Sequence, residues 1–235
     1  MRRRIAFMAL GAAAVLALAA GGLHLWWWNE QRLQPERLAA CERGKQAGQM
    51  RAHAESIALL SQCLDAWLPD VERSYVLRIR AWNHARLDRH VPAVTDMEAA
   101  FKLRPPMGYR DLMDYAVSLR EAGRAEDSLK AVLEAERTEG GNASPTTLYH
   151  KGAALQELGQ SSQAVTALSL AIGGEPYSPY AHWRRALAYE ALGNAALAKA
   201  DFARAERLLR DQGKTVAGEK LRPALYAKLR EHGLD

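Results

Sequence analysis

Residues 145–178 read PTTLYHKGAALQELGQSSQAVTALSLAIGGEPYS, and residues 179–212 read PYAHWRRALAYEALGNAALAKADFARAERLLRDQ. Both segments are 34 residues long, and the second repeats the small and large positions of the first. The matching pairs are Gly152 and Ala186, Gly159 and Gly193, Ala164 and Ala198, Leu168 and Phe202, and Ala171 and Ala205. A fixed period of this length indicates a repeat architecture.

The same template recovers weaker copies toward the N-terminus. One of them has Ser128 where a small Ala is usual, and the most degenerate has Gly44, Leu60 and Cys63 in register. We therefore expect an array over residues 37–212, divided into units 37–70, 74–107, 109–142, 145–178 and 179–212.

This pattern resembles the tetratricopeptide repeat, a family of paired antiparallel helices with a 34-residue period. The resemblance implies an all-α solenoid of about five helical hairpins, since one hairpin cannot bury its apolar face alone. Small residues are expected where the two helices of a hairpin cross. Gly123, Gly159 and Gly193 are expected in the turns between them, where a helix C-terminus often needs positive φ.

Residues 213–235 are expected to form a capping helix and tail. Leu221–His232 fits an amphipathic helix with Leu221, Leu225, Tyr226 and Leu229 on one face. Pro223 is then placed in the first turn, where proline is tolerated.

The N-terminus carries a targeting signal. Residues 1–4 form a basic stub with Arg2, Arg3 and Arg4, and residues 5–28 contain no Asp, Glu, Lys or Arg. Twenty-four helical residues rise about 36 Å, enough to cross a bilayer core of about 30 Å. We expect one transmembrane helix at 5–28, a juxtamembrane linker at 29–36, and a body in the periplasm, because arginines favour the cytoplasmic side.

The alternative for this segment is a cleaved signal peptide. Ala17-Leu18-Ala19 fits a small-x-small cleavage site, and cleavage there would leave a soluble periplasmic protein.

The net charge of the chain argues against nucleic-acid binding. It is +5 and falls to about +2 without the three arginines. That is too little for a nucleic-acid surface, which needs clustered basic charge.

The two cysteines are Cys41 and Cys63. They fall early in the first helix and late in the second helix of the first unit, places that face each other in an antiparallel hairpin. An exported chain meets an oxidising compartment, which favours a disulfide; the alternative is two small buried core residues.

No catalytic motif stands out. The sequence has no Gly-rich phosphate loop, no H-E-x-x-H and no G-x-S-x-G, and its His and Cys residues have no zinc-ligand spacing. We expect neither an enzyme nor a cofactor, metal or small-molecule substrate.

The surface of the repeats is the remaining candidate for a functional site, as a binding surface for protein partners. In the tetratricopeptide family the first helix of each unit lines a concave groove for peptides, and the resemblance implies a groove here. The mapped peptide-binding residues are Tyr75, Arg78, Trp82, Arg86, Arg110, Met113, Tyr149, His150, Tyr180, Trp183 and Arg184, with Asp114, Arg120, Gln156 and Glu190 beside them. Aromatic and Arg side chains dominate binding hot spots, and this set suits an extended or helical peptide of acidic character.

Two functions follow from this surface. The first is a scaffold tethered to the inner membrane that assists assembly or maturation of envelope complexes. The second is a holdase, a chaperone-like protein that binds exported unfolded chains.

Overall fold

The computed structural model describes residues 34–138, 144–213 and 215–234. All regular secondary structure in these ranges is helical, which confirms the all-α prediction. The predicted stub 1–4, the predicted span 5–28 and linker residues 29–33 lie outside the described residues. Linker residues 34–36 are helical, so the first hairpin begins earlier than expected.

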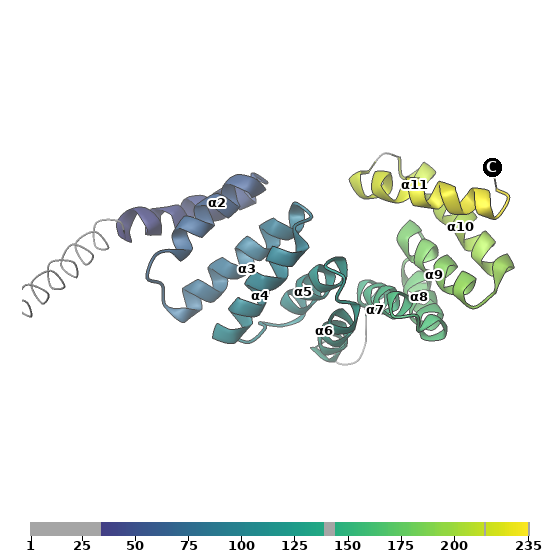
Figure 1. Cartoon of the computed structure of the whole chain (residues 1–235), viewed down its shortest axis with the longest axis horizontal. Coiled ribbons are helices and arrows are strands. Elements are labelled where there is room, and N and C mark those ends of the chain that lie inside the picture. The colour runs from purple at the N-terminus through teal and green to yellow at the C-terminus, as the bar shows by residue number, and fades with distance from the viewer. Residues whose placement is uncertain (1–33, 139–143, 214, 235) are drawn as a thin grey trace, which may run out of the picture. The chain divides into compact units, whose positions relative to one another are not determined.

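The described helices alternate with short turns (Figure 1). A first helix covers residues 34–49 and is here called helix 34–49. It is followed by α2 (His53–Leu64), α3 (Asp70–Arg86), α4 (His90–Leu103), α5 (Tyr109–Glu121), α6 (Ala125–Thr138), α7 (Pro145–Glu157), α8 (Ser161–Gly174), α9 (Pro179–Ala191), α10 (Ala195–Asp211) and α11 (Val216–Glu231).

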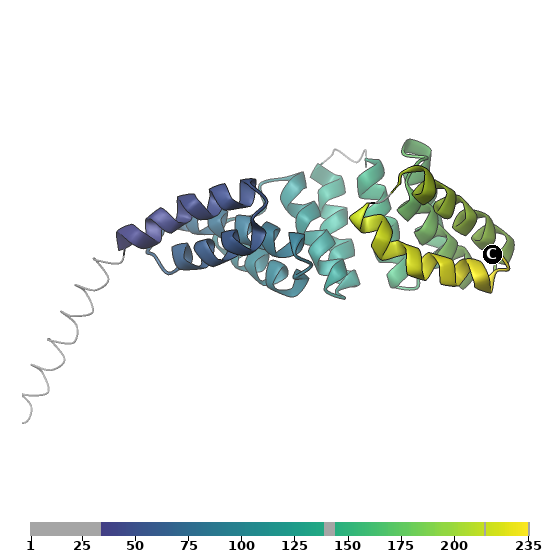
Figure 2. The same ribbon diagram turned by 90° about the horizontal axis from the view of Figure 1, so that it is seen from above.

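The chain divides into two compact units. Unit 1 holds the described residues up to Asp88 together with Glu98–Arg104, and unit 2 holds Arg89–Met97 and the described residues from Pro105 onward. In unit 2 each helix from α5 to α11 packs on the next one along the chain, and α7 also contacts both α5 and α9 (Figures 1 and 2).

One register of small and large side chains runs through every hairpin. A small residue on the first helix is followed, twelve residues later, by a small residue on the second helix. The pairs are Gly44 and Ser56, Ala81 and Ala93, Ala116 and Ser128, Gly152 and Ala164, and Ala186 and Ala198. All ten are buried. Four residues after the second member stands a larger buried side chain: Leu60, Met97, Val132, Leu168 or Phe202.

Contacts at these pairs explain why the side chains must be small. A Cβ atom added to Gly152 would lie 2.5 Å from Cγ of Leu168, closer than two carbon atoms can approach. Where the second residue is serine, its buried hydroxyl needs a partner. Ser128 Oγ donates to the carbonyl oxygen of Ala116 at 2.7 Å, and Ser56 Oγ donates to that of Gly44 at 2.7 Å.

The turns inside the hairpins of unit 2 close as predicted. Gly123, Gly159 and Gly193 have φ of 79°, 73° and 75°. Gly159 N donates to Gln156 O and Gln160 N donates to Leu155 O, the paired hydrogen bonds of a Schellman motif.

In unit 1 the same conformation is carried by residues other than glycine. Arg51 and Asp88 have φ of 62° and 57°. The hydrogen bonds from Arg51 N to Gly48 O and from Ala52 N to Ala47 O have the Schellman spacing. The degenerate repeats therefore keep the turn geometry without its usual residue.

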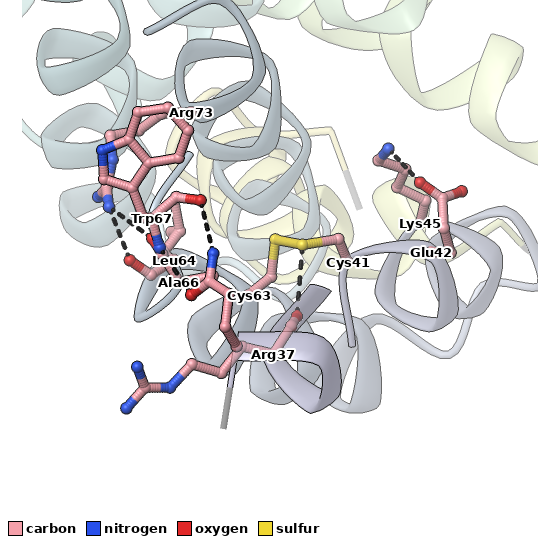
Figure 3. Close-up of a disulfide and its surroundings, with 10 residues drawn as sticks. Arg37, Cys41, Glu42, Lys45, Cys63, Leu64, Ala66, Trp67 and Arg73 are labelled. Carbon is pink, nitrogen blue, oxygen red and sulfur yellow. Dashed lines mark hydrogen bonds and ion pairs between the residues drawn. A yellow bond between two sulfur atoms is a disulfide. The ribbon is translucent and has the colours of Figure 1, made fainter. Parts of the chain in front are cut away.

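The predicted disulfide is confirmed. Cys41 Sγ and Cys63 Sγ are 2.08 Å apart and join helix 34–49 to α2 (Figure 3). Both cysteines are buried in the core of unit 1, which also contains Leu60, Val76 and Leu77.

Side chains from the helices on either side hold the loop that follows the disulfide-bonded hairpin. Gln34 exchanges two hydrogen bonds with the backbone of Trp67, at 2.9 and 3.1 Å. Arg73 Nη2 donates to the carbonyl oxygens of Leu64 and Ala66, as Figure 3 shows. The indole of Trp67 is 75% exposed, although its backbone is held in place.

The capping helix is longer than predicted. It begins at Val216 because the Thr215 hydroxyl accepts a hydrogen bond from Gly218 N at 3.0 Å and caps it. The placement of Pro223 in the first turn was therefore wrong: it lies inside the helix. Leu225 and Leu229 are buried against Phe202 and its neighbours, as a cap requires.

The register predicts that the crossing points cannot take extra volume. Ala198→Leu or Ala164→Leu should lower the free energy of unfolding by about 1–3 kcal/mol, because added methylenes in a packed core force shifts of the backbone. Thermal or denaturant unfolding measures this. The matched control is Ala196→Leu, the same change at an exposed position of α10; equal effects at the two α10 positions would contradict the register.

The disulfide predicts a reductant-sensitive stability. Reduction should lower the free energy of unfolding by about 3 kcal/mol, since the bridge restricts the unfolded chain. Denaturant unfolding with and without reductant tests this, and the Cys41→Ala, Cys63→Ala double variant should show no reductant effect. Two thiols that react with a probe in the unreduced, denatured protein would refute the bridge.

Candidate functional site

The candidate site in unit 2 is the face formed by the first helices of successive hairpins, α5, α7 and α9. These helices lie next to one another, since α7 contacts both of its counterparts. Serines begin two of them: Ser144 caps α7 and Ser178 caps α9, each followed by a proline at the first helical position. The Ser-Pro sequences therefore set where α7 and α9 begin, and with that the position of each residue along these helices.

A row of charged side chains links the three helices. Glu157 Oε1 on α7 lies 2.9 Å from Arg120 Nη1 on α5 and 2.8 Å from Arg184 Nη1 on α9. Arg120 also pairs with Glu121, and Arg184 Nη1 donates to Gln156 Oε1 at 2.8 Å. The side chain of Arg120 is 6% exposed, so its charge is neutralised inside the protein. We call this set, Arg120, Glu121, Gln156, Glu157 and Arg184, the charge row.

His150 lies next to the charge row. Burial, and then the positive charge of Arg120, lower the pKa of His150 to about 4. Its imidazole is therefore neutral at pH 7. The ring of Tyr149 meets it edge to face, with centroids 4.9 Å apart.

A small cavity opens between α7 and α9. Its volume is about 170 Å³, and two residues of the predicted set, Tyr149 and Tyr180, line it. The other lining residues are Pro145, Thr146, Ala171, Glu175, Ser178 and Ala181. A neighbouring cavity of about 530 Å³ shares Glu175, Ser178 and Tyr180 with it. We call the smaller one the tyrosine cavity.

Four of the predicted residues occupy one repeated position, and none of them is fully exposed. Arg78 and Met113 are buried, and Tyr149 and Trp183 are partly buried. Arg78 Nη2 donates to Arg104 O at 2.9 Å and its guanidinium lies over Phe101.

Met113 and Trp183 also face the interior. Met113 belongs to a core cluster with Leu112, and the rings of Trp183 and Phe202 are 5.3 Å apart. The repeated position shared by these four residues therefore points between helices. Of the four, only Tyr149 lines one of the two cavities described above.

The exposed predicted residues of unit 1 lie on α3. Tyr75 is 49% exposed and Trp82 is 40% exposed, and Arg86 is also exposed. Lys45 of helix 34–49 lies over the Tyr75 ring at 5.5 Å, and Arg86 lies over the Trp82 ring at 5.9 Å. Together with exposed Val71, these side chains make an aromatic stripe along α3. Arg110, on α5 of unit 2, is exposed as well.

Sequence reasoning missed the partners that hold the charged residues. Glu157 was not singled out, and neither was the pairing of Glu190 with Lys228 at 3.0 Å and with His232 at 3.1 Å. Burial raises the pKa of Glu190, but hydrogen bonds from Lys228 and His232 lower it more, and it lies below its usual value. These partners are 27 to 42 residues apart, so no local pattern reveals them.

The described residues contain no group of His, Cys, Asp and Glu side chains that could hold a metal ion. In the same part of the chain, no helix combines the length and apolar character needed to cross a bilayer.

Solved structures match the arrangement of these helices. MamA of strain MSR-1 superposes with a TM-score of 0.62 at 15% sequence identity, covering 76% of this chain and 99% of its own. MamA of Desulfovibrio magneticus RS-1, from residue 41 to its end, gives a TM-score of 0.63 at 16% identity, covering 76% and 97%. MamA is a tetratricopeptide-repeat protein.

This chain has the tetratricopeptide-repeat fold. At this level of identity the likeness establishes the fold. No protein-family model and no curated protein matches the sequence. What the tetratricopeptide fold does in this chain therefore has to be argued from its own side chains.

The charge row predicts a cost for removing its shared carboxylate. Glu157→Gln keeps the shape but leaves the buried Arg120 with Glu121 as its acidic partner, and should lower the free energy of unfolding by about 1–3 kcal/mol. Denaturant unfolding measures this. Glu126→Gln, whose side chain is 79% exposed beside Lys130, is the control and should change stability by less than about 0.5 kcal/mol. Unchanged stability of Glu157→Gln would show that the row contributes nothing.

Proposed function

We propose that this chain is a non-enzymatic interaction scaffold that binds a peptide segment of a partner protein on its first-helix face. The observation that carries the proposal is the tyrosine cavity, where Tyr149 and Tyr180 of adjacent first helices line a hollow of about 170 Å³. Tyrosine offers a large apolar ring and a hydroxyl at little entropic cost, and such residues commonly anchor peptides.

The contacts narrow the chemistry of the bound segment. Arg120 and Arg184 share Glu157, so their charge is largely compensated within the protein. The cavity itself is lined by one carboxylate, Glu175, and by no Lys or Arg. We infer that the partner inserts an apolar side chain into the cavity, and that acidic residues of the segment would pair with exposed Arg110 on α5 of the same unit instead.

The body is proposed to lie outside the cytoplasm, tethered to the inner membrane through residues 5–28. The Cys41–Cys63 disulfide supports export, since disulfides persist in oxidising compartments. Five residues lie between Trp28 and Gln34, so the six steps from one to the other reach about 20 Å at most. The exposed Trp67, held beside Gln34, would then lie close to the interface that tryptophan prefers. N-terminal sequencing of the mature protein separates this anchor from a cleaved signal peptide.

In this location the scaffold would hold a component of an envelope complex during its assembly or maturation. Such a role needs a rigid surface of fixed spacing. The buried pairs of small residues provide that rigidity in each hairpin.

A second candidate function is the holdase for exported unfolded chains. The aromatic stripe of unit 1 favours it, because Val71, Tyr75 and Trp82 present exposed apolar surface along one helix. Surfaces of that kind bind many segments weakly.

Site-specific photo-crosslinking distinguishes the two functions. A photoreactive amino acid in place of Tyr180, in the membrane-bound protein in cells, should give one discrete adduct, because a lined cavity selects its ligand. The Tyr149→Ala variant should lose that adduct while keeping wild-type helix content.

The matched control is Tyr226→Ala, which changes a 40% exposed tyrosine on α11, away from this cavity, and should keep the adduct. A smear of unrelated adducts would favour the holdase. Absence of any adduct at position 180 would refute the proposed peptide site.

A further inference from the structure

The last two helices of unit 2, α10 and α11, border an open cleft. The corresponding pair earlier in the unit, α8 and α9, is joined to the next helix by one side chain. Arg185 on α9 donates through Nη1 to Ser169 Oγ on α8 at 3.0 Å and through Nε to Asp201 Oδ2 on α10 at 2.7 Å. One side chain of α9 thus joins α8 to α10, the second helix of the next hairpin.

At the end of the unit the corresponding cleft lies between α10 and α11. Ala203 stands 34 residues after Ser169 and lines it. The hollow between these two helices has a volume of about 490 Å³, and we call it the terminal cleft.

The terminal cleft has an apolar floor and a basic rim. Carbon-rich side chains come from both helices: Ala203 from α10, Tyr226 and Leu229 from α11, and Leu234 after it. Tyr226 is 40% exposed although it was expected to pack on the apolar face of the capping helix.

The side chains that line the terminal cleft carry more positive than negative charge. Arg207, Arg210 and Arg230 stand against one carboxylate, Glu206, which already pairs with Arg210 in an i,i+4 contact. Arg207 and Arg230, one from each helix, therefore give the cleft an excess of positive charge. A ligand that fills it gains from negative charge beside its apolar surface.

We propose that the terminal cleft binds an amphipathic α-helix of a partner protein, with Asp or Glu residues flanking its apolar stripe. The bound helix takes the place that the second helix of a further hairpin would occupy. Two packed helices offer a groove between their side-chain ridges into which a third helix fits. Apolar residues at i, i+3, i+4 and i+7 cover the floor, and flanking carboxylates reach Arg207 and Arg230.

This surface is separate from the tyrosine cavity, and the inference does not depend on the proposed function. No residue lines both the terminal cleft and the tyrosine cavity. One scaffold could therefore hold two partners, one by an extended segment and one by a helix.

Three synthetic peptides test the proposal on the full-length protein in detergent. The first is a helix former with a leucine stripe flanked by Glu, the second has the same stripe flanked by Lys, and the third is a scrambled version of the first. Fluorescence anisotropy should show binding of the Glu peptide alone.

Charge reversal provides the decisive comparison. Arg207→Glu with Arg230→Glu should weaken binding of the Glu peptide at least about tenfold and create binding of the Lys peptide. Both arginines are exposed, so the variant should keep the wild-type melting temperature. Tyr226→Ala should weaken binding of the Glu peptide to the wild-type protein and of the Lys peptide to the charge-reversed protein. Tyr180→Ala should leave both unchanged.

Three results would overturn the proposal. Equal binding of the Glu and Lys peptides would remove the role of charge. Equal binding of the scrambled peptide would mean that acidic character alone is recognised, without a helix. Unaltered binding of the Glu peptide by the charge-reversed protein would place the interaction elsewhere.

Discussion

Close approach of two helices at a pair of small side chains is the constraint on which the hairpins within each unit depend. Gly152 has no room for a Cβ atom beside Leu168, and the four other first-helix positions in this register are also Gly or Ala. Once the backbones are this close, the larger residue four positions further on fills the remaining space. Where serine replaces alanine, as at Ser56 and Ser128, a hydrogen bond to a carbonyl oxygen of the facing helix satisfies the hydroxyl. Ala and Ser can therefore exchange without loosening the crossing.

The elements were predictable because this register lies in the spacing of residues along the chain. The register is clearest in units 145–178 and 179–212, and the same twelve-residue spacing of small residues continues into the degenerate first hairpin. The disulfide followed from the hairpin geometry. The turn of the first hairpin was less visible, because Arg51 adopts the left-handed conformation that glycine marks in later repeats. The start of α11 was missed because Thr215 caps the helix six residues before Leu221, the first apolar residue used to place it.

The candidate site was only partly predictable, for a physical reason. Arg78, Met113, Tyr149 and Trp183 share one position in the repeat, and the packing of neighbouring helices turns that position inward. Whether such a side chain reaches a cavity depends on the size of its neighbours, which a single sequence does not reveal. The charge row likewise joins residues from three hairpins through Glu157. The face expected to bind an acidic peptide therefore holds an aromatic cavity, and two of its arginines share one carboxylate.

The central claim is that these hairpins are stable only when stacked. Circular dichroism of a peptide covering 145–178 tests it most directly, with thermal unfolding followed at the same wavelength. The account predicts a largely unfolded chain without a cooperative transition, since a single pair of helices cannot bury the leucines and alanines that cross it. A fully helical peptide that melts cooperatively on its own would contradict it.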